Sequence, residues 1–238
     1  MTKRRTEVAM IDRRQILCGL ASASSLILLG CAHSTVAPGA PAGEHDAASA
    51  EAEVTPGEDL MQEHGILERV LLIYGEAARR VEGKADVDVN VVTQGARIVQ
   101  SFIEEYHEKL EEQFVFPRLE AARRETDLVA VLRRQHVRGR EVTAEILRRA
   151  ATGKADSELA QLLRAFERMY RPHAAREDTV LFPAFRDVVG RSGYRELGEQ
   201  FEDQEHQKFG EHGFENAVAQ VARLEASLGI GELTTFTP

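Results

Sequence analysis

Apolar residues follow a helical period through most of the chain from about residue 58 onward. They recur three and four positions apart, which places them on one side of a helix with polar residues opposite. In the first such stretch the apolar stripe contains Leu60, Leu67, Leu71 and Tyr74. Glycines and polar residues interrupt the pattern between successive stretches. The pattern predicts five helices, at about 58–82, 88–122, 126–153, 156–190 and 193–228.

Each of the first four predicted helices also carries a histidine on its apolar stripe. The second and fourth helices share the motif H-x3-E-x4-F-P, which begins at His107 and again 66 residues later at His173. Four residues are just over one helical turn, so the histidine and glutamate of each motif project from one face about 6 Å apart. The ionisable residues on these stripes are His64, His107, Glu111, His136, His173 and Glu177.

The four central helices therefore form two hairpins that share the same order of sequence features. Each hairpin begins with a helix that carries a single stripe histidine and ends with a helix that carries the motif. An internal repeat of this kind predicts an all-α fold, a four-helix bundle with pseudo-twofold symmetry, and the fifth helix is an addition to it. A composition with 29% charged residues and no tryptophan agrees with a helical protein.

Buried imidazoles and carboxylates are costly unless they pair with a partner or bind a metal. A lone histidine on a stripe is commonly a satisfied core residue, but six such residues on consecutive helices indicate a metal site. Nitrogen and oxygen ligands without a thiolate suit iron or manganese, with zinc as an alternative. Six ligands exceed the four of a structural zinc site. The economical interpretation is two iron ions, with the four histidines as terminal ligands and Glu111 and Glu177 as bridges.

Residues 58–190 resemble a hemerythrin-like HHE cation-binding domain. The resemblance rests on Glu63-His64-Gly65, His107-Glu108-x-x-Glu111 with Phe116-Pro117, Gln135-His136, and His173-x-x-x-Glu177 with Phe182-Pro183. It implies an up-and-down four-helix bundle around a non-haem di-iron centre bridged by two carboxylates. Oxygen-carrying members have a further histidine where this chain has Arg140. The set of four histidines is similar to that of proteins that repair iron centres, which implies open iron positions and argues against a pure oxygen carrier.

Several residues near these motifs have two interpretations. Glu108 could supply an additional carboxylate to the metal or could face solvent. Tyr106 and Tyr170 could hydrogen-bond to the ligands, or they could fill the core. His206 and His212, which lie among acidic residues in the fifth helix, could form a peripheral metal site. A solvated acidic face is the favoured interpretation of that helix.

Residues 1–31 have the pattern of an export signal, and residues 32–57 that of a disordered tether. The apolar run from Ile16 to Gly30 follows the pair Arg13-Arg14 and is too short to span a membrane. The arginine pair resembles a twin-arginine export motif, and Leu28-Leu29-Gly30-Cys31 resembles a bacterial lipobox. An uncleaved anchor and an ordinary secretion signal are the alternatives. The hypothesis is a protein of the bacterial cell envelope, anchored to a membrane through lipid on Cys31 and lying on the periplasmic side or the outer membrane.

The charge of the chain argues against nucleic acid as a partner. The net charge is −9. It becomes −12 (25 basic against 37 acidic residues) once residues 1–30, with five basic and two acidic side chains, are removed. An acidic domain lacks the positive patch that binds phosphates.

The sequence favours a metal-binding protein that holds a small diatomic ligand, oxygen or nitric oxide, and it leaves open whether the protein is an enzyme. One alternative is a di-iron oxidoreductase that acts on peroxide or oxygen. Another is an iron donor in cluster repair, and a third is a metal-free interaction domain on a lipid tether. The physiological ligand, the redox partner and the oligomeric state do not follow from the sequence.

Overall fold

The computed structural model describes residues 54–238, and all the regular structure of this part of the chain is helical, without strands. The predicted all-α class is therefore confirmed. The predicted export signal, Cys31 and nearly all of the predicted tether lie outside the described residues. The helical elements are α1 (Pro56–Glu82), α2 (Val89–Ile98), η2 (Val99–His107), α3 (Glu108–Leu110), η3 (Glu111–Val115), α4 (Phe116–Ala121), α5 (Thr126–Ala150), α6 (Ser157–Arg176), η4 (Glu177–Leu181), α7 (Phe182–Phe209), α8 (Gly213–Leu228) and η5 (Leu233–Phe236).

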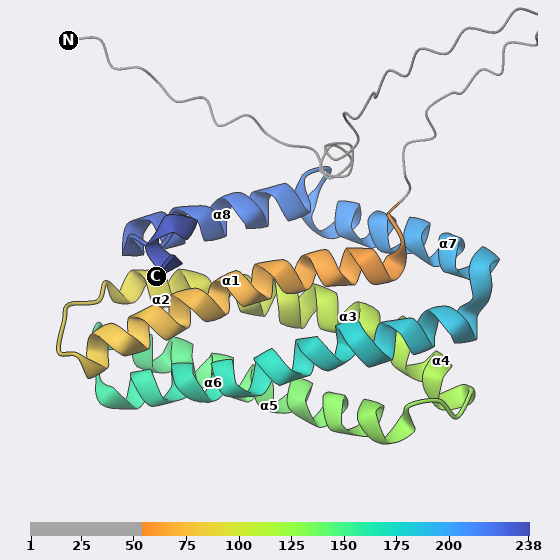
Figure 1. The fold of residues 1–238 in the computed structure, drawn as a ribbon, viewed down its shortest axis with the longest axis horizontal. Helices are drawn as coiled ribbons and strands as arrows, with labels where there is room; N and C mark the ends of the chain where they lie inside the picture. Colours follow the sequence, from red (N-terminus) through yellow and green to blue (C-terminus); the bar gives the residue numbers. More distant parts are fainter. Residues whose placement is uncertain (1–53) are drawn as a thin grey trace, which may run out of the picture. The chain divides into compact units, whose positions relative to one another are not determined.

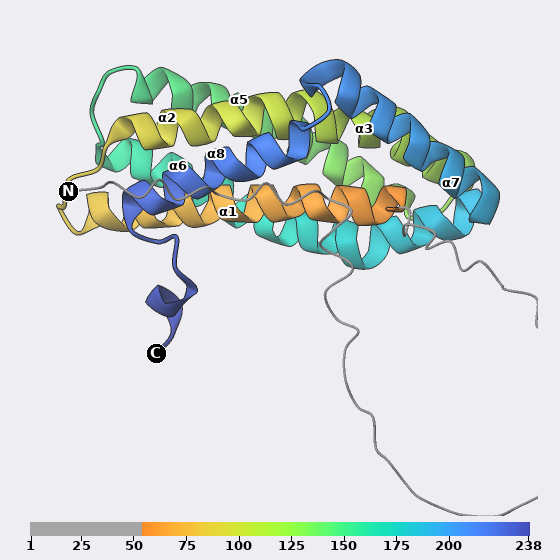
Figure 2. The same ribbon diagram turned by 90° about the horizontal axis from the view of Figure 1, so that it is seen from above.

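Four long helical segments, formed by α1, by α2 to α4, by α5, and by α6 to α7, lie side by side and enclose the core (Figures 1 and 2). Helix α1 packs against α6 and α2, and α5 packs against α6 and α2, so the contacts close into a ring. The second segment runs without interruption from α2 to α4, and the fourth runs from α6 through η4 into α7. Helix α8 lies against α1 and α2 on the outside of this ring.

The part of the chain after residue 190 differs from the single fifth helix that the pattern predicts. Helix α7 bends at Gly190, where φ is 72° and ψ is 170°, and it ends at Gly210, where φ is 79°. Such positive φ values are accessible to glycine and strained for other residues. A separate helix, α8, then follows, so the structure has more helices than four plus one, and the exact helix count of the bundle stays a prediction.

Side-chain caps explain where two of the long helices begin. Thr55 accepts a hydrogen bond from the backbone N–H of Glu58, whose side chain accepts one in return from the N–H of Thr55. This reciprocal capping box satisfies two donors at the start of α1. Asp156 caps α6 by accepting from the N–H of Leu159 at 2.9 Å.

The two Phe-Pro pairs explain why the helices change register beside the predicted ligands. Proline has no N–H and its ring crowds the carbonyl one turn earlier. In both motifs the helix widens to π geometry just before the proline, and the N–H groups of Phe116 and Phe182 donate to the carbonyls of Glu111 and Glu177, five residues back. The helices continue instead of breaking, and the π-helical segments η3 and η4 begin at the predicted bridging glutamates. A longer π-helical segment, η2, ends at His107. Such segments often occur at functional sites.

Candidate metal centre

The structure brings together all six residues that the sequence singles out as ligands. Each is nearly inaccessible to solvent, with exposed fractions between 0% and 3%. They come from the four segments of the ring: α1, η2 with η3, α5, and α6 with η4. Their placement is in agreement with the predicted site, and their role as ligands stays a prediction. The residues are His64, His107, Glu111, His136, His173 and Glu177.

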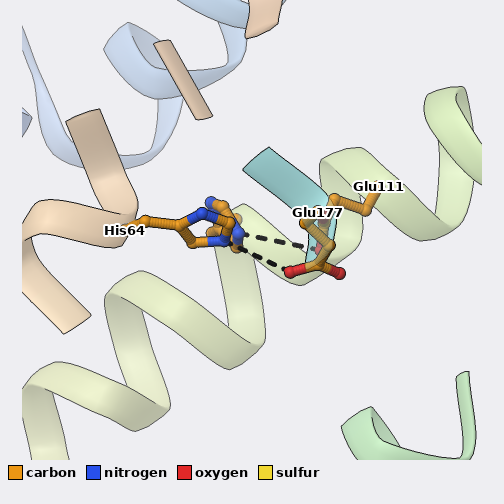
Figure 3. A group of neighbouring side chains, drawn as sticks. His64, Glu111 and Glu177 are labelled. Carbon is orange, nitrogen blue, oxygen red and sulfur yellow. Dashed lines mark ion pairs between the residues drawn. The ribbon is translucent and has the colours of Figure 1, made fainter. Parts of the chain in front are cut away.

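The first half of the centre contains His64 and His107. Their rings are 4.6 Å apart, and His64 Nε2 lies 3.3 Å from an oxygen of Glu177. His107 Nε2 lies 3.7 Å from an oxygen of Glu111. One ligand atom from each of these four residues lies within 4.8 Å of the others. Figure 3 shows His64 directed toward Glu177, with Glu111 beside it.

The second half contains His136 and His173, whose rings are 5.1 Å apart. His173 Nε2 lies 3.0 Å from an oxygen of Glu177, and His136 Nε2 lies 3.4 Å from an oxygen of Glu111. His136, His173 and Glu177 also offer ligand atoms within 4.8 Å of one another. Glu177 thus belongs to both groups, as a carboxylate that bridges two ions would.

Each of the four histidines uses its other ring nitrogen for a hydrogen bond that fixes its orientation. The Nδ1–H of His64 donates to Asp178 at 2.6 Å, and that of His107 donates to Glu63 at 2.7 Å. The remaining two contacts join His173 to Gln135 at 3.0 Å and His136 to Glu112 at 3.2 Å. Because carboxylate and amide oxygens only accept here, the proton is assigned to Nδ1. Every Nε2 atom is then directed at the centre, as in metal-binding histidines.

These acceptors form a ring around the bundle that sequence reasoning missed. Each acceptor is the immediate sequence neighbour of a predicted ligand, but it serves a histidine on the next segment. The signal was present, because the pairs Glu63-His64 and Gln135-His136 stand beside ligands. The sequence does not show which helix each of these adjacent residues faces. The acceptor and histidine pairs are Glu63 with His107, Glu112 with His136, Gln135 with His173, and Asp178 with His64.

The phenylalanines of the two motifs repeat this symmetry. Phe182 stacks on His64 with ring centroids 5.6 Å apart, and Phe116 stacks on His136 at 5.4 Å. Both phenylalanines are buried. They cover one face of each imidazole and exclude water from it, so the Phe-Pro pairs have a packing role as well as a backbone role.

The oxygens of the two central glutamates show that the site suits a cation. Both oxygens of Glu111 and both of Glu177 are buried without a hydrogen-bond donor, and the same holds for Nε2 of His136. Buried carboxylates in a native protein ordinarily have donors or a metal. Four carboxylate oxygens and four inward imidazole nitrogens are a donor set that fits divalent or trivalent iron or manganese.

The pKa values of several of the buried glutamates and histidines are shifted because these ionisable groups lie close together, away from solvent. Burial raises the pKa of Glu111 far above its usual range, and the neighbouring Glu177 raises it further. Burial would lower the pKa of His64, but Asp178 and Glu177 raise it to about 9. In the other half, burial lowers the pKa of His136 to about 4 despite its bond to Glu112.

Glu108 lies in the interior and not at the surface. Its two oxygens accept from the hydroxyl of Tyr170 at 2.8 Å and from Arg140 at 2.6 Å. Burial raises its pKa to about 8, although Arg140 and Tyr170 lower it. Arg140 also binds Glu112 at 2.6 Å, so the residue that stands in place of a fifth histidine ties together two carboxylates beside the second half. Glu108 is near Glu112 and His136 and is not part of the group around Glu177.

The two tyrosines have different surroundings. Tyr170 lies edge-on to the ring of His173, with centroids 5.2 Å apart, and its hydroxyl reaches Glu108. Space for that hydroxyl exists because residue 139 is glycine, where an added Cβ would lie 1.9 Å from it. Tyr106 packs against Phe102 and Phe209 in the core.

The histidines of the last helices lie apart from this centre. His206 and His212 are exposed, and within residues 54–238 neither belongs to a group of three metal-ligating side chains. Their neighbour Glu205 is buried and lies close to Asp59 and Glu63. No helix within the described part of the chain combines the length and the apolar character needed to cross a membrane.

Similarity to known proteins agrees with this geometry. Residues 55–185 match the family described as the Hemerythrin HHE cation binding domain. The chain is similar to Uncharacterized protein Mb2018 of Mycobacterium bovis and to Uncharacterized protein Rv1995 of Mycobacterium tuberculosis. It is 45% identical to each over 242 residues, which cover 99% of this chain and 94% of the relative. No solved structure matches the chain significantly. The family resemblance is confirmed: the chain belongs to the hemerythrin HHE cation-binding domain family.

Proposed function

We propose that this protein holds two iron ions between its four central helical segments and binds a small diatomic ligand, oxygen or nitric oxide, at them. The observation that carries the proposal is the sharing of Glu177 between two groups of buried histidine and glutamate side chains. In this arrangement His64 and His107 would hold one ion, and His136 and His173 the other. Glu111 and Glu177 would lie between the ions. The ions would supply redox chemistry and open coordination positions for the diatomic ligand.

The chain's own residues would prepare the centre for this role. The four Nδ1 hydrogen bonds orient the imidazoles before a metal arrives, which lowers the cost of ordering them. The rings of Phe116 and Phe182 keep water away. With Arg140 in place of a fifth histidine, each ion has two nitrogen ligands from the protein, which leaves room for an added ligand.

Metal loading tests this function directly. Purified protein loaded anaerobically with Fe(II) should contain two irons per chain, and exposure to oxygen should produce near-ultraviolet charge-transfer bands. Nitric oxide added without oxygen should give iron-nitrosyl spectra. A His206→Ala variant, altered at an exposed histidine outside the centre, is the matched control and should load normally. Absence of iron uptake by the folded protein would end the proposal.

A second candidate, an enzyme that reduces peroxide or oxygen, is favoured by the contact between Tyr170 and Glu108. A phenol and a carboxyl that are hydrogen-bonded to each other beside His173 could hold or move a proton near a reacting ligand. Sustained peroxide turnover that falls at least tenfold in Tyr170→Phe, with iron content unchanged, would favour this enzyme role. Binding without turnover would favour the first proposal.

We also propose that the protein is exported and attached to a membrane of the cell envelope through lipid on Cys31. The support is the pairing of Arg13-Arg14 with an apolar run that ends in Leu-Leu-Gly-Cys. Export of a folded protein would allow iron to be inserted beforehand. Replacing Arg13 and Arg14 by lysine should stop export, and Cys31→Ser should release the protein from membranes. Unchanged fractionation of both variants would contradict this location.

A further inference from the structure

The two halves of the centre have equivalent ligands but unequal supporting groups. Glu63 precedes His64 and Gln135 precedes His136, so these two acceptors occupy equivalent places in the repeat. In the same way, Asp178 follows Glu177 and Glu112 follows Glu111. The repeat therefore offers two matched comparisons of the group that accepts from a histidine Nδ1. Both comparisons differ in the same direction.

In the half with His64 and His107, both acceptors are carboxylates at short distance. Asp178 lies 2.6 Å from Nδ1 of His64, and Glu63 lies 2.7 Å from Nδ1 of His107. Among residues 54–238, Asp178 makes no ion pair with an arginine or lysine, so its negative charge acts on the imidazole alone. A carboxylate acceptor makes an imidazole more basic and a better metal ligand.

In the half with His136 and His173, one acceptor is neutral and the other is shared with cations. The acceptor for His173 is the amide oxygen of Gln135, at 3.0 Å. The acceptor for His136 is Glu112, whose distance of 3.2 Å is the longest of the four. Glu112 also binds Arg140 at 2.6 Å and Lys109 at 2.5 Å. Two cations on one carboxylate leave less negative charge to strengthen the imidazole.

We infer that the two metal positions are unequal, and that Gln135 together with the Arg140–Glu112 pair makes the position at His136 and His173 the weaker one. This inference rests on the proposed two-ion function. The position at His64 and His107 fills first and retains its ion. The other position fills second and exchanges its ion more readily. Gln135 contacts the ligand His173, and Arg140 acts on His136 through Glu112, so both are positioning residues that do not touch the metal.

Exchange of the equivalent acceptors tests the inference. Cobalt(II) serves as the probe, because its visible absorption reports coordination while the titration gives the affinity of each step. In the wild-type protein the first cobalt should bind at least tenfold more tightly than the second. Gln135→Glu gives the weaker half a carboxylate and should tighten the second step about tenfold, the usual size of such effects. Glu63→Gln gives the stronger half an amide and should weaken the first step by a similar factor, so that the two steps merge.

Three further measurements test the role of Arg140, the location of the first ion and the fold of the variants. Arg140→Gln should also tighten the second step, because it returns the charge of Glu112 to His136. Crystals grown with one equivalent of cobalt should show anomalous scattering between His64 and His107. Circular dichroism checks the fold of each variant, and a gain of affinity in Gln135→Glu is not a result that structural damage produces.

The possible outcomes separate the inference from the function on which it rests. Two cobalt ions bound with equal affinity, or a single ion found at His136 and His173, would overturn the inequality and leave the two-ion function intact. A second step that does not respond to Gln135→Glu or Arg140→Gln would overturn the assignment to these residues. Failure to bind a second ion at large excess of cobalt would overturn both proposals.

Discussion

The two halves of the candidate metal centre match closely in the residues directed inward and diverge in the residues behind them. Each half has two histidines, a share of Glu111 and Glu177, and a phenylalanine stacked on its lone histidine. Behind the rings, one half has two carboxylates, whereas the other has an amide and a carboxylate held by Arg140. A duplicated motif can thus keep one arrangement of inward side chains while the groups behind them differ.

Removing the carboxylate common to both halves should have the largest effect. Glu177→Gln keeps the shape of the side chain but removes the charge that both groups share, so we expect both ions to be lost. An ion present at a thousandfold excess over its dissociation constant stabilises the folded state by about 4 kcal/mol. Two ions would then contribute roughly 8 kcal/mol to the free energy of unfolding. The variant should lose this contribution, as measured by thermal unfolding in the presence of iron.

The metal-free form of the same variant supplies the control. Glu177 lies 3.3 Å from Nε2 of His64 and 3.0 Å from Nε2 of His173. Burial alone would raise the pKa of Glu177, but these two imidazoles hold it well below its usual range, so the charge is stabilised even without metal. Without metal, the variant should therefore be less stable than the wild type, but by much less than in the presence of iron. An equal loss of stability with and without metal would indicate that Glu177 has only a structural role.

The halves should also differ in how their metal affinity depends on pH. Asp178 and Glu177 raise the pKa of His64 to about 9 against the effect of burial, whereas burial lowers that of His136 to about 4. A metal requires the neutral imidazole. Between pH 7 and 9 the first ion must displace a proton from His64, and its affinity should rise about tenfold per pH unit. The advantage of this position over the other should therefore be smallest at pH 7 and largest near pH 9. The second ion displaces none from His136, so its affinity should change less.

The stability of the metal-free chain should move in the opposite direction. Because the pKa of His64 is higher in the folded chain than the usual 6.5, its contribution to stability is complete below pH 6.5 and is lost as the pH rises through about 9.

Titration calorimetry in buffers of different ionisation enthalpy counts the protons that are released when the first ion binds. Asp178→Asn lowers the pKa of His64 and should flatten the pH dependence of the first step. An unchanged slope would show that another group, such as Glu111, releases the proton.

The six inward-facing histidines and glutamates could be predicted from sequence because they lie on helical stripes, whereas the groups behind them could not. Period and spacing alone place His64 and Glu111 on inward faces, and the structure brings them together. The partner of Glu63 is His107, on another segment, and this pairing depends on how the helices rotate about their axes. The π-helical turns and the break at Gly210 were missed for a related reason, since both depend on single backbone hydrogen bonds that leave the hydrophobic period almost unchanged.

A pair of glycines gives the smallest and most local test of the difference between the halves. Gly139, in the second half, lies against the hydroxyl of Tyr170, where a new Cβ would come within 1.9 Å. Gly65, next to His64 in the first half, has nothing within 4 Å of that position. Gly139→Ala should destabilise the protein by about 1–3 kcal/mol through overpacking. Gly65→Ala should stabilise it by roughly 0.5–1 kcal/mol, because alanine favours a helix interior.

Adding Tyr170→Phe to Gly139→Ala shows whether the clash is the cause. Phenylalanine removes the hydroxyl at 1.9 Å but leaves the ring carbon Cζ 2.7 Å from the new methyl group, so the double variant should recover only part of the stability lost, as measured by the midpoint of urea unfolding. Its remaining deficit would combine this ring contact with the loss of the hydrogen bond to Glu108, and the Tyr170→Phe single variant measures the second part. If Gly139→Ala were as stable as Gly65→Ala, the second half would be loosely packed around Tyr170. The asymmetry between the halves would then be limited to the charges of their acceptors.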